Sequence, residues 1–221
     1  MKFAVLAIAC TLVVAEFANA AVILDQQHLF SSSIADSSNG NVSEVGQTFT
    51  VGVAGTLDHI DVLMFQLGSI FTPTGDPKLS VYATAGGVPT GAPLVTMSVP
   101  QANVPLNNPG LVTFDVSAAA IPVSIGEVLA FGISTTSEIG PYFLPNDDDT
   151  GAPGDYTAGA AFRRTISPVQ AWQPLTPAVD HGFQTFVSAT VPEPSTFALA
   201  GFALVGLGII ARRNQDRRGR H

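Results

Sequence analysis

Charged residues are scarce in this chain: Asp, Glu, Lys and Arg make up 12% of its 221 residues, about half the share of an ordinary soluble domain. This scarcity argues against a disordered polyampholyte, a coiled coil and a nucleic-acid-binding protein, each of which needs many charges. Tryptophan occurs once and tyrosine three times, but 14 phenylalanines supply aromatic mass for a core. The 21 glycines and 16 prolines favour many turns and few long helices.

Cysteine occurs once, as Cys10, within an apolar run over residues 3–15. A basic residue precedes this run, and Ala18 and Ala20 place small residues where a signal peptidase reads them. We therefore predict that residues 1–20 are a signal peptide cleaved after Ala20. The alternative is an uncleaved membrane helix, for which the run is short. The mature chain then has no disulfide, and its stability depends on its core.

The C-terminus, residues 191–221, joins three features in a fixed order. A motif with two prolines holds the backbone extended and removes amide donors, which suits a protease groove. Residues 197–211 are apolar and predict a short transmembrane helix of roughly 22 Å. The tail, residues 212–221, has five arginines and one aspartate, which predicts a cytoplasmic end. The signal residues are the motif Pro192, Glu193 and Pro194, and the stop Arg212 and Arg213.

This ending closely resembles the PEP-CTERM sorting signal of secreted bacterial proteins, including the Pro-Glu-Pro of the motif itself. The resemblance implies recognition by exosortase, a membrane-embedded cysteine transpeptidase that cleaves near the motif and releases or transfers the ectodomain to the cell envelope. Such proteins are typical of Gram-negative bacteria that make exopolysaccharide and biofilm. Phe197 stands where the family often has tryptophan, and the tail continues to His221. The alternative is a plain membrane anchor that is never processed.

The body of the chain, residues 21–190, carries 14 acidic and three basic residues, a net charge of −11. Such a surface repels nucleic acid and anionic polymers, so we expect no nucleic-acid partner. It tolerates divalent cations and neutral glycans. The simplest interpretation of most of these charges is solubility. The three basic residues are Lys78, Arg163 and Arg164.

Apolar residues in the body recur at every second position, the pattern of half-buried strands. Gln47 interrupts this alternation within residues 45–53, and residues 60–67 are nearly continuously apolar, as in a strand buried on both faces. Glycine, proline and asparagine clusters separate roughly nine to twelve short strands. We therefore predict an all-β fold with a single β-sandwich, jelly-roll-like ectodomain. The residues expected in its core include Leu79, Val81, Ala83, Val112, Phe114, Val116, Leu129, Phe131 and Ile133.

The body also resembles the β-sandwich ectodomains called choice-of-anchor domains, which are often attached to this sorting signal. The resemblance rests on residues 81–83, residues 156–162, and Trp172 ahead of a closing strand at residues 183–187. It implies the fold more than any activity, because one sandwich hosts many functions.

Two groups in the body are candidates for binding. Asp147 and Asp149 are two residues apart and precede a glycine. Together with Asp155 they resemble the start of a calcium loop. An acidic surface loop is the commoner explanation, so we predict no cofactor and keep structural calcium as an alternative. Trp172 lies in a proline-punctuated stretch and is a candidate for stacking on a sugar ring, although such residues usually fill a core or its rim.

Signatures of catalysis are absent from the sequence. The body has no Gly-x-Ser-x-Gly elbow and no thiol, and its three histidines are far apart. We therefore predict that the protein is not an enzyme.

The two ends of the chain predict its location. The protein should cross the inner membrane, be anchored transiently by its C-terminal helix, and end at the cell surface or outside the cell. There it would act as an adhesive or structural module, with extracellular polysaccharide as a partner. The alternatives are a calcium-dependent lectin and, because carboxylates are plentiful, an envelope polysaccharide hydrolase.

Overall fold

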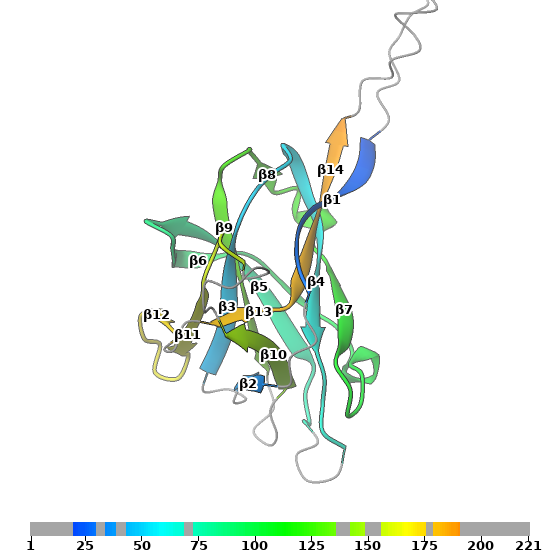
Figure 1. Cartoon of the computed structure of the whole chain (residues 1–221), viewed down its shortest axis with the longest axis vertical. Coiled ribbons are helices and arrows are strands. Elements are labelled where there is room, and N and C mark those ends of the chain that lie inside the picture. The colour runs from blue at the N-terminus through cyan, green and yellow to red at the C-terminus, as the bar shows by residue number, and fades with distance from the viewer. Residues whose placement is uncertain are drawn as a thin grey trace, which may run out of the picture. The chain divides into compact units, whose positions relative to one another are not determined.

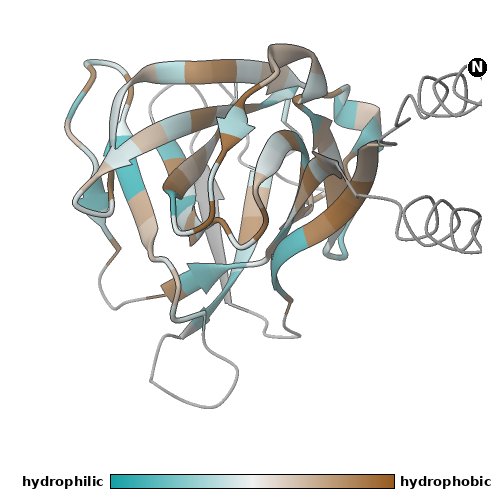
Figure 2. Ribbon diagram, turned by 90° about the horizontal axis from the view of Figure 1, so that it is seen from above, coloured by the Kyte–Doolittle hydropathy of each residue, from teal (hydrophilic) through white to brown (hydrophobic). Residues whose placement is uncertain are grey.

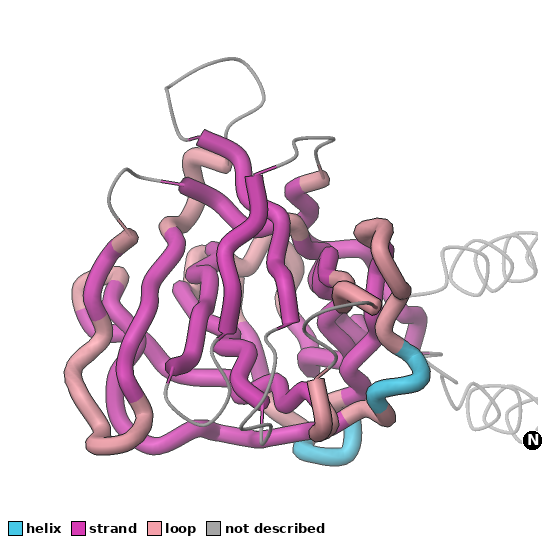
Figure 3. Tube along the Cα trace, turned by 90° about the horizontal axis from the view of Figure 1, so that it is seen from below, coloured by secondary structure: helices cyan, strands magenta, loops and turns pink. Residues whose placement is uncertain are grey.

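The structure is a computed structural model that describes residues 20–29, 34–38, 43–68, 73–135, 142–148, 156–175 and 179–190. These residues form β-strands joined by turns and two short 3-10 helices, and this part of the chain contains no α-helix (Figure 3). By contacts the chain divides into two units, Val22–Ala189 and the chain ends, Met1–Ala21 with Thr190–His221. The fold below is that of the first unit.

The strands are short, and β-turns or brief loops separate most of them. The two 3-10 helices are η2 (Gln101–Asn103) and η3 (Ser117–Ala119). In chain order the strands are β1 (Ala20–His28), β2 (Ile34–Ser38), β3 (Ser43–Thr50), β4 (Gly55–Met64), β5 (Pro77–Ala85), β6 (Val88–Ser98), β7 (Gly110–Asp115), β8 (Pro122–Val123), β9 (Val128–Thr135), β10 (Tyr142–Asp148), β11 (Ala161–Thr165), β12 (Gln173–Pro174), β13 (Val179–His181) and β14 (Phe183–Thr190).

The described strands form three sheets (Figure 1). A six-stranded sheet has the order β12-β11-β3-β9-β5-β6, and a five-stranded sheet has the order β1-β14-β4-β7 with β8 paired to β4. A three-stranded sheet has the order β13-β10-β2. The main apolar core takes residues from both larger sheets, for example Phe49 and Phe131 from one and Ile60 and Phe183 from the other. The predicted all-β sandwich is therefore confirmed.

Alternation along the strands decides which side chains form this core, and Figure 2 shows the change of hydropathy along the ribbons. Val112 and Phe114 of β7 are buried, whereas their neighbours in the strand are exposed. Leu129, Phe131 and Ile133 of β9 are also buried as predicted. The period-two pattern thus predicts the inner faces of the longer strands correctly.

Two local predictions are wrong. Ala83 is exposed rather than buried: it lies opposite the core residue Leu129 of β9, but the last three residues of β5 lie beyond the buried part of the strand. Strand β4 is not buried on both faces: Ile60 is buried but Asp61 beside it is partly exposed. The described residues also contain 14 strands, more than expected, because β8, β12 and β13 have only two or three residues each.

The connection between β5 and β6 shows why the sequence needs glycine there. Gly86 and Gly87 form the whole two-residue link, and their φ angles are +60° and +78°. A hairpin turn of this type needs positive φ at both central residues, which glycine adopts without a steric penalty. The glycine pair that the sequence presents as a turn is therefore a tight hairpin.

Candidate functional site

Four side chains gather on the six-stranded sheet: Glu44 on β3, Tyr82 on β5, Arg164 on β11 and Trp172 just before β12. Arg164 Nε donates a hydrogen bond to Glu44 Oε2 at 2.8 Å, and Arg164 Nη2 lies 2.6 Å from the same oxygen. The Tyr82 hydroxyl donates to Glu44 Oε1 at 2.8 Å and accepts from Arg164 Nη2 at 2.7 Å. The Arg164 guanidinium carbon lies 4.6 Å from the Trp172 ring centre and 5.0 Å from that of Tyr82. We call these four residues the outer-face cluster.

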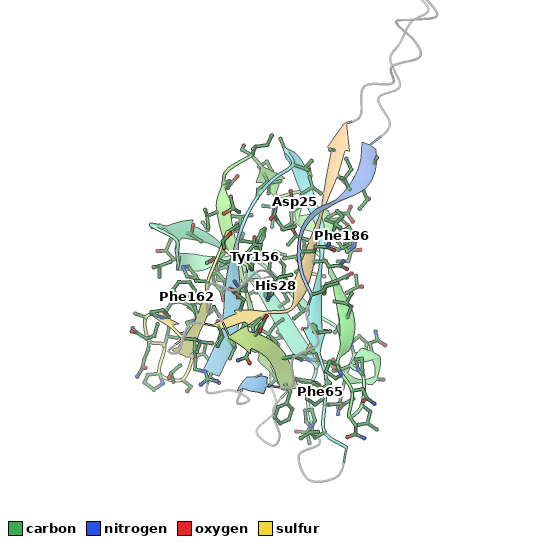
Figure 4. All side chains as sticks on the ribbon, in the orientation of Figure 1. Asp25, His28, Phe65, Tyr156, Phe162 and Phe186 are labelled. Atoms are coloured by element: carbon green, nitrogen blue, oxygen red, sulfur yellow. The ribbon has the colours of Figure 1, made fainter. Side chains whose placement is uncertain are left out.

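Strand alternation places this cluster on the face opposite the core. Val45 and Val81 are buried core residues, so Glu44 and Tyr82, each one position away, turn outward. Gly132 on β9 makes room for the acid, since a Cβ there would lie 2.5 Å from Glu44 Oε1. Tyr82 and Trp172 belong, with Ala130 and Phe162, to a second apolar cluster apart from the main core. Figure 4 shows Phe162 well away from Phe186, which lies on the other large sheet.

Burial governs the electrostatics of the outer-face cluster. The Glu44 side chain is 3% exposed and that of Arg164 14%. Burial, followed by the negative charge of Glu44, raises the pKa of Tyr82, so the hydroxyl keeps its proton at neutral pH. A carboxylate at this depth is costly unless a cation and hydrogen bonds compensate it. The cluster therefore holds one guanidinium in a fixed position, between two aromatic rings and a carboxylate.

A pocket of about 220 Å³ opens beside this guanidinium. Its lining combines guanidinium, amide and hydroxyl groups with apolar surface, and the Glu44 carboxylate contacts the lining guanidinium of Arg164. The lining residues are Arg163, Arg164, Thr165, Gln170, Ala171, Gln173, Pro174 and Leu175.

A second polar group lies inside the sandwich, at Gln47. Gln47 is fully buried on the core face of β3, where the sequence showed a break in the apolar alternation. Its Nε2 donates to Asp180 Oδ1 at 2.7 Å, and its Oε1 accepts from the backbone amide of His181 at 3.1 Å. Asp180 and His181 are themselves buried. Gln47 thus ties the three-residue strand β13 to the six-stranded sheet.

A third polar group joins β1 to its neighbours through Asp25. Asp25 Oδ1 accepts hydrogen bonds from the backbone amides of Gly52 at 2.8 Å and Val53 at 2.6 Å. Its Oδ2 accepts from Thr185 Oγ1 on β14 at 3.3 Å. One carboxylate therefore links the first strand both to the last strand and to the turn that follows β3 (Figure 4).

Strands β1 and β14 are neighbours in their sheet. The Gln26 amide donates to Thr185 Oγ1 at 3.2 Å, and the Gln184 and Gln27 side chains are hydrogen-bonded at 3.1 Å. Residue numbers rise along β1 as they fall along β14, so the two strands run antiparallel. The start of β1 consequently lies beside the end of β14 (Figure 1).

Tyr156 packs between these elements and the core. Its hydroxyl accepts from the Thr50 amide at 3.3 Å and lies 3.4 Å from Gln26 Oε1. Burial, aided by the negative charges of Asp25 and Asp180, raises the pKa of Tyr156 to about 12. The phenol is therefore neutral in any physiological medium and acts here as a packing and hydrogen-bonding group.

The structure describes one of the three predicted calcium ligands. Asp147 lies on β10, opposite Asp180 of β13, whereas Asp149 and Asp155 lie outside the described residues. Where the chain is described, no three His, Cys, Asp or Glu side chains gather as a metal site would require. Structural calcium therefore stays a prediction.

Trp172, the candidate for sugar stacking, is 8% exposed. Arg164 lies over its ring, and Tyr82 meets it edge-on with the ring centres 5.5 Å apart. With so little of its surface exposed, the indole offers a sugar little area. Its position matches the core or rim role that such aromatics usually have.

Most of the predicted processing residues lie outside the described part of the chain. Ala20 is the first residue of β1. No helix in the described ranges has the length and apolar character to cross a membrane, and the apolar segment 197–211 falls outside them. The other residues outside them are Ala18, Pro192, Glu193, Pro194, Arg212 and Arg213.

Sequence reasoning missed the outer-face cluster as a unit. One signal for it was present, because Arg163 and Arg164 are two of the three basic residues in the body. Glu44 gave no signal, since nothing local distinguishes it from the other acids. The break at Gln47 was visible, but its partner Asp180 was not.

Comparison with known proteins identifies one segment. Residues 190–218 match the PEP-CTERM protein-sorting motif, which confirms the resemblance drawn from the sequence. The match begins at Thr190, the last residue of β14. No curated protein matches the chain at a significant level.

Proposed function

We propose that this chain is an exported bacterial protein that exosortase processes, and that its ectodomain serves outside the cell as a non-catalytic adhesive or structural module. The observation that carries the proposal is the PEP-CTERM protein-sorting motif at residues 190–218. Such a motif implies a secreted protein that is anchored in the membrane until exosortase acts on it.

The arrangement of the first and last strands supports this processing. The start of β1 lies beside the end of β14, so the predicted signal-peptide site after Ala20 and the sorting motif follow from one end of one sheet. The extended chain from Thr190 to Pro192 spans at most about 7 Å. Few residues of sequence therefore separate the motif from the last strand of the folded domain.

The interior polar groups support a structural role for the ectodomain. Asp25, Gln47 and Glu44 each hold a strand or a loop in place through hydrogen bonds at 2.6–3.3 Å. Each therefore has a structural task, which for Gln47 and Glu44 accounts for their burial. A sandwich locked in this way suits a module that must stay folded outside the cell without disulfides.

Cell fractionation tests the proposal. We expect a Pro192→Ala, Pro194→Ala variant to stay full-length in the inner membrane, since the rigid extended motif is lost. The matched control replaces two exposed prolines of the ectodomain, Pro93→Ala and Pro100→Ala, and should be released like the unaltered protein. Normal release of the motif variant would show that the motif is not the sorting determinant.

A further inference from the structure

The pocket beside Arg164 lies at one edge of the six-stranded sheet, where β11, β12 and the loop between them supply most of its lining. We infer that this pocket binds one unit of a neutral sugar, as part of an uncharged extracellular polysaccharide. This inference rests on the proposed extracellular role of the ectodomain and names the class of ligand for it.

The charges at the pocket are compensated within the protein, which favours an uncharged ligand. The Arg164 guanidinium is paired with the Glu44 carboxylate, and Arg163 also has a partner within the protein. Glu44 in turn accepts hydrogen bonds from both Arg164 and Tyr82, so its carboxylate is not left to hold a cation. The net charge of −11 on the body opposes the approach of an anion. A neutral ligand meets neither obstacle.

Hydrogen-bonding side chains that the fold does not use gather at this pocket. Gln170 and Gln173 line it, and their side chains make no hydrogen bond to the described residues; the same holds for the Thr165 hydroxyl. An amide and a hydroxyl can each donate and accept a hydrogen bond, as the hydroxyl groups of a sugar do. Every described glutamine outside the pocket has its side chain hydrogen-bonded to the protein, namely Gln26, Gln27, Gln47, Gln66, Gln101 and Gln184.

The remaining lining residues suit the ring of a sugar. Ala171, Pro174 and Leu175 supply apolar surface for the C–H groups of the ring, while the amides face its hydroxyl groups. The volume of about 220 Å³ lies below the roughly 300–1,000 Å³ of drug-sized sites. The pocket therefore fits a single sugar unit rather than a long segment of polysaccharide.

Calorimetric titration of the mature protein, purified from producing cells, tests the inference. The probes are neutral trimers of glucose, of mannose and of galactose, and the charged comparison is a trimer of galacturonate. The test variant combines Gln170→Ala with Gln173→Ala and so removes both unused amides at exposed positions, where substitution disturbs the fold little. The matched control removes two exposed amides outside the lining, Asn103→Ala with Asn108→Ala.

We expect at least one neutral trimer to bind, with the same affinity at low and high salt, because salt does not screen an uncharged ligand. The galacturonate trimer should bind at least about tenfold more weakly, through repulsion by the acidic body. The glutamine variant should lose about tenfold in affinity for the neutral trimer, since two hydrogen bonds are removed, and the asparagine control should lose none.

The inference is overturned if none of the neutral trimers binds, if binding falls with salt, if galacturonate binds as well as the neutral sugars, or if the glutamine variant binds fully. None of these results touches release from the cell, so fractionation reports on the proposed function separately.

Discussion

Gln47 Nε2 donates a 2.7 Å hydrogen bond to Asp180 Oδ1 inside the sandwich, across 133 residues of sequence. A glutamine amide this deeply buried needs a hydrogen-bond partner. Its bond to Asp180 supplies one and docks β13, a strand of only three residues. The pair thus explains why an otherwise apolar face of β3 carries a glutamine.

Removal of the Gln47 amide should destabilise the domain. Gln47→Leu keeps the site filled but removes the hydrogen bond that the amide donates to the Asp180 carboxylate, and bonds to charged groups contribute about 1.5–3 kcal/mol. Urea unfolding of the mature protein should show a loss of that order. Gln170→Leu, at an exposed position, is the control and should change the free energy of unfolding by less than about 0.5 kcal/mol. Equal stability of the two variants would contradict the structural role of Gln47.

The domain should lose stability when one partner of the ion pair in the outer-face cluster is removed, but much less when both partners are removed. Arg164→Met leaves the buried Glu44 carboxylate unpaired, which typically costs about 3–5 kcal/mol. Adding Glu44→Leu removes that charge, so the double variant should recover most of the loss. Thermal unfolding of the two variants measures this difference. A double variant as unstable as the single one would show that Arg164 acts by packing rather than by pairing.

Alkaline pH should destabilise the fold through its tyrosines. Burial first, then nearby acids, raises the pKa of all three, Tyr156 to about 12. An unfolded tyrosine ionises near pH 10, so the folded state holds these protons more tightly. The stabilisation of the fold by these protonated tyrosines is complete below about pH 10 and is lost as the pH rises through about 12. In a spectrophotometric titration, tyrosinate absorbance should therefore appear together with unfolding. Ionisation near pH 10 in a folded protein would contradict the burial of the phenols.

Much of the architecture was predictable because it depends on local patterns. Alternation at period two identified the core faces of β7 and β9, and the Gly86-Gly87 pair marked a break between strands that the structure shows to be a tight hairpin. The sorting signal was readable for the same reason, since its motif, apolar segment and basic tail are contiguous. These features need no knowledge of the tertiary fold.

The polar sites were not predictable in this way, because strand pairing assembles them. Arg164 and Glu44 are 120 residues apart and meet only because β11 pairs with β3. Ala83 keeps the alternation and lies opposite the core residue Leu129, yet it is exposed, so its place in the pattern of β5 did not by itself decide its burial. Trp172 was visible in the sequence, but its burial depends on Arg164 and Tyr82 from two other strands.

Mass spectrometry of the C-terminal peptide of the protein from producing cells tests the central claim most directly. We predict that the chain ends close to Pro192–Pro194, with residues 197–221 removed and Arg212 and Arg213 absent. A stable cellular form that continues to His221 would show that exosortase does not process this chain, and the account of its sorting would fail.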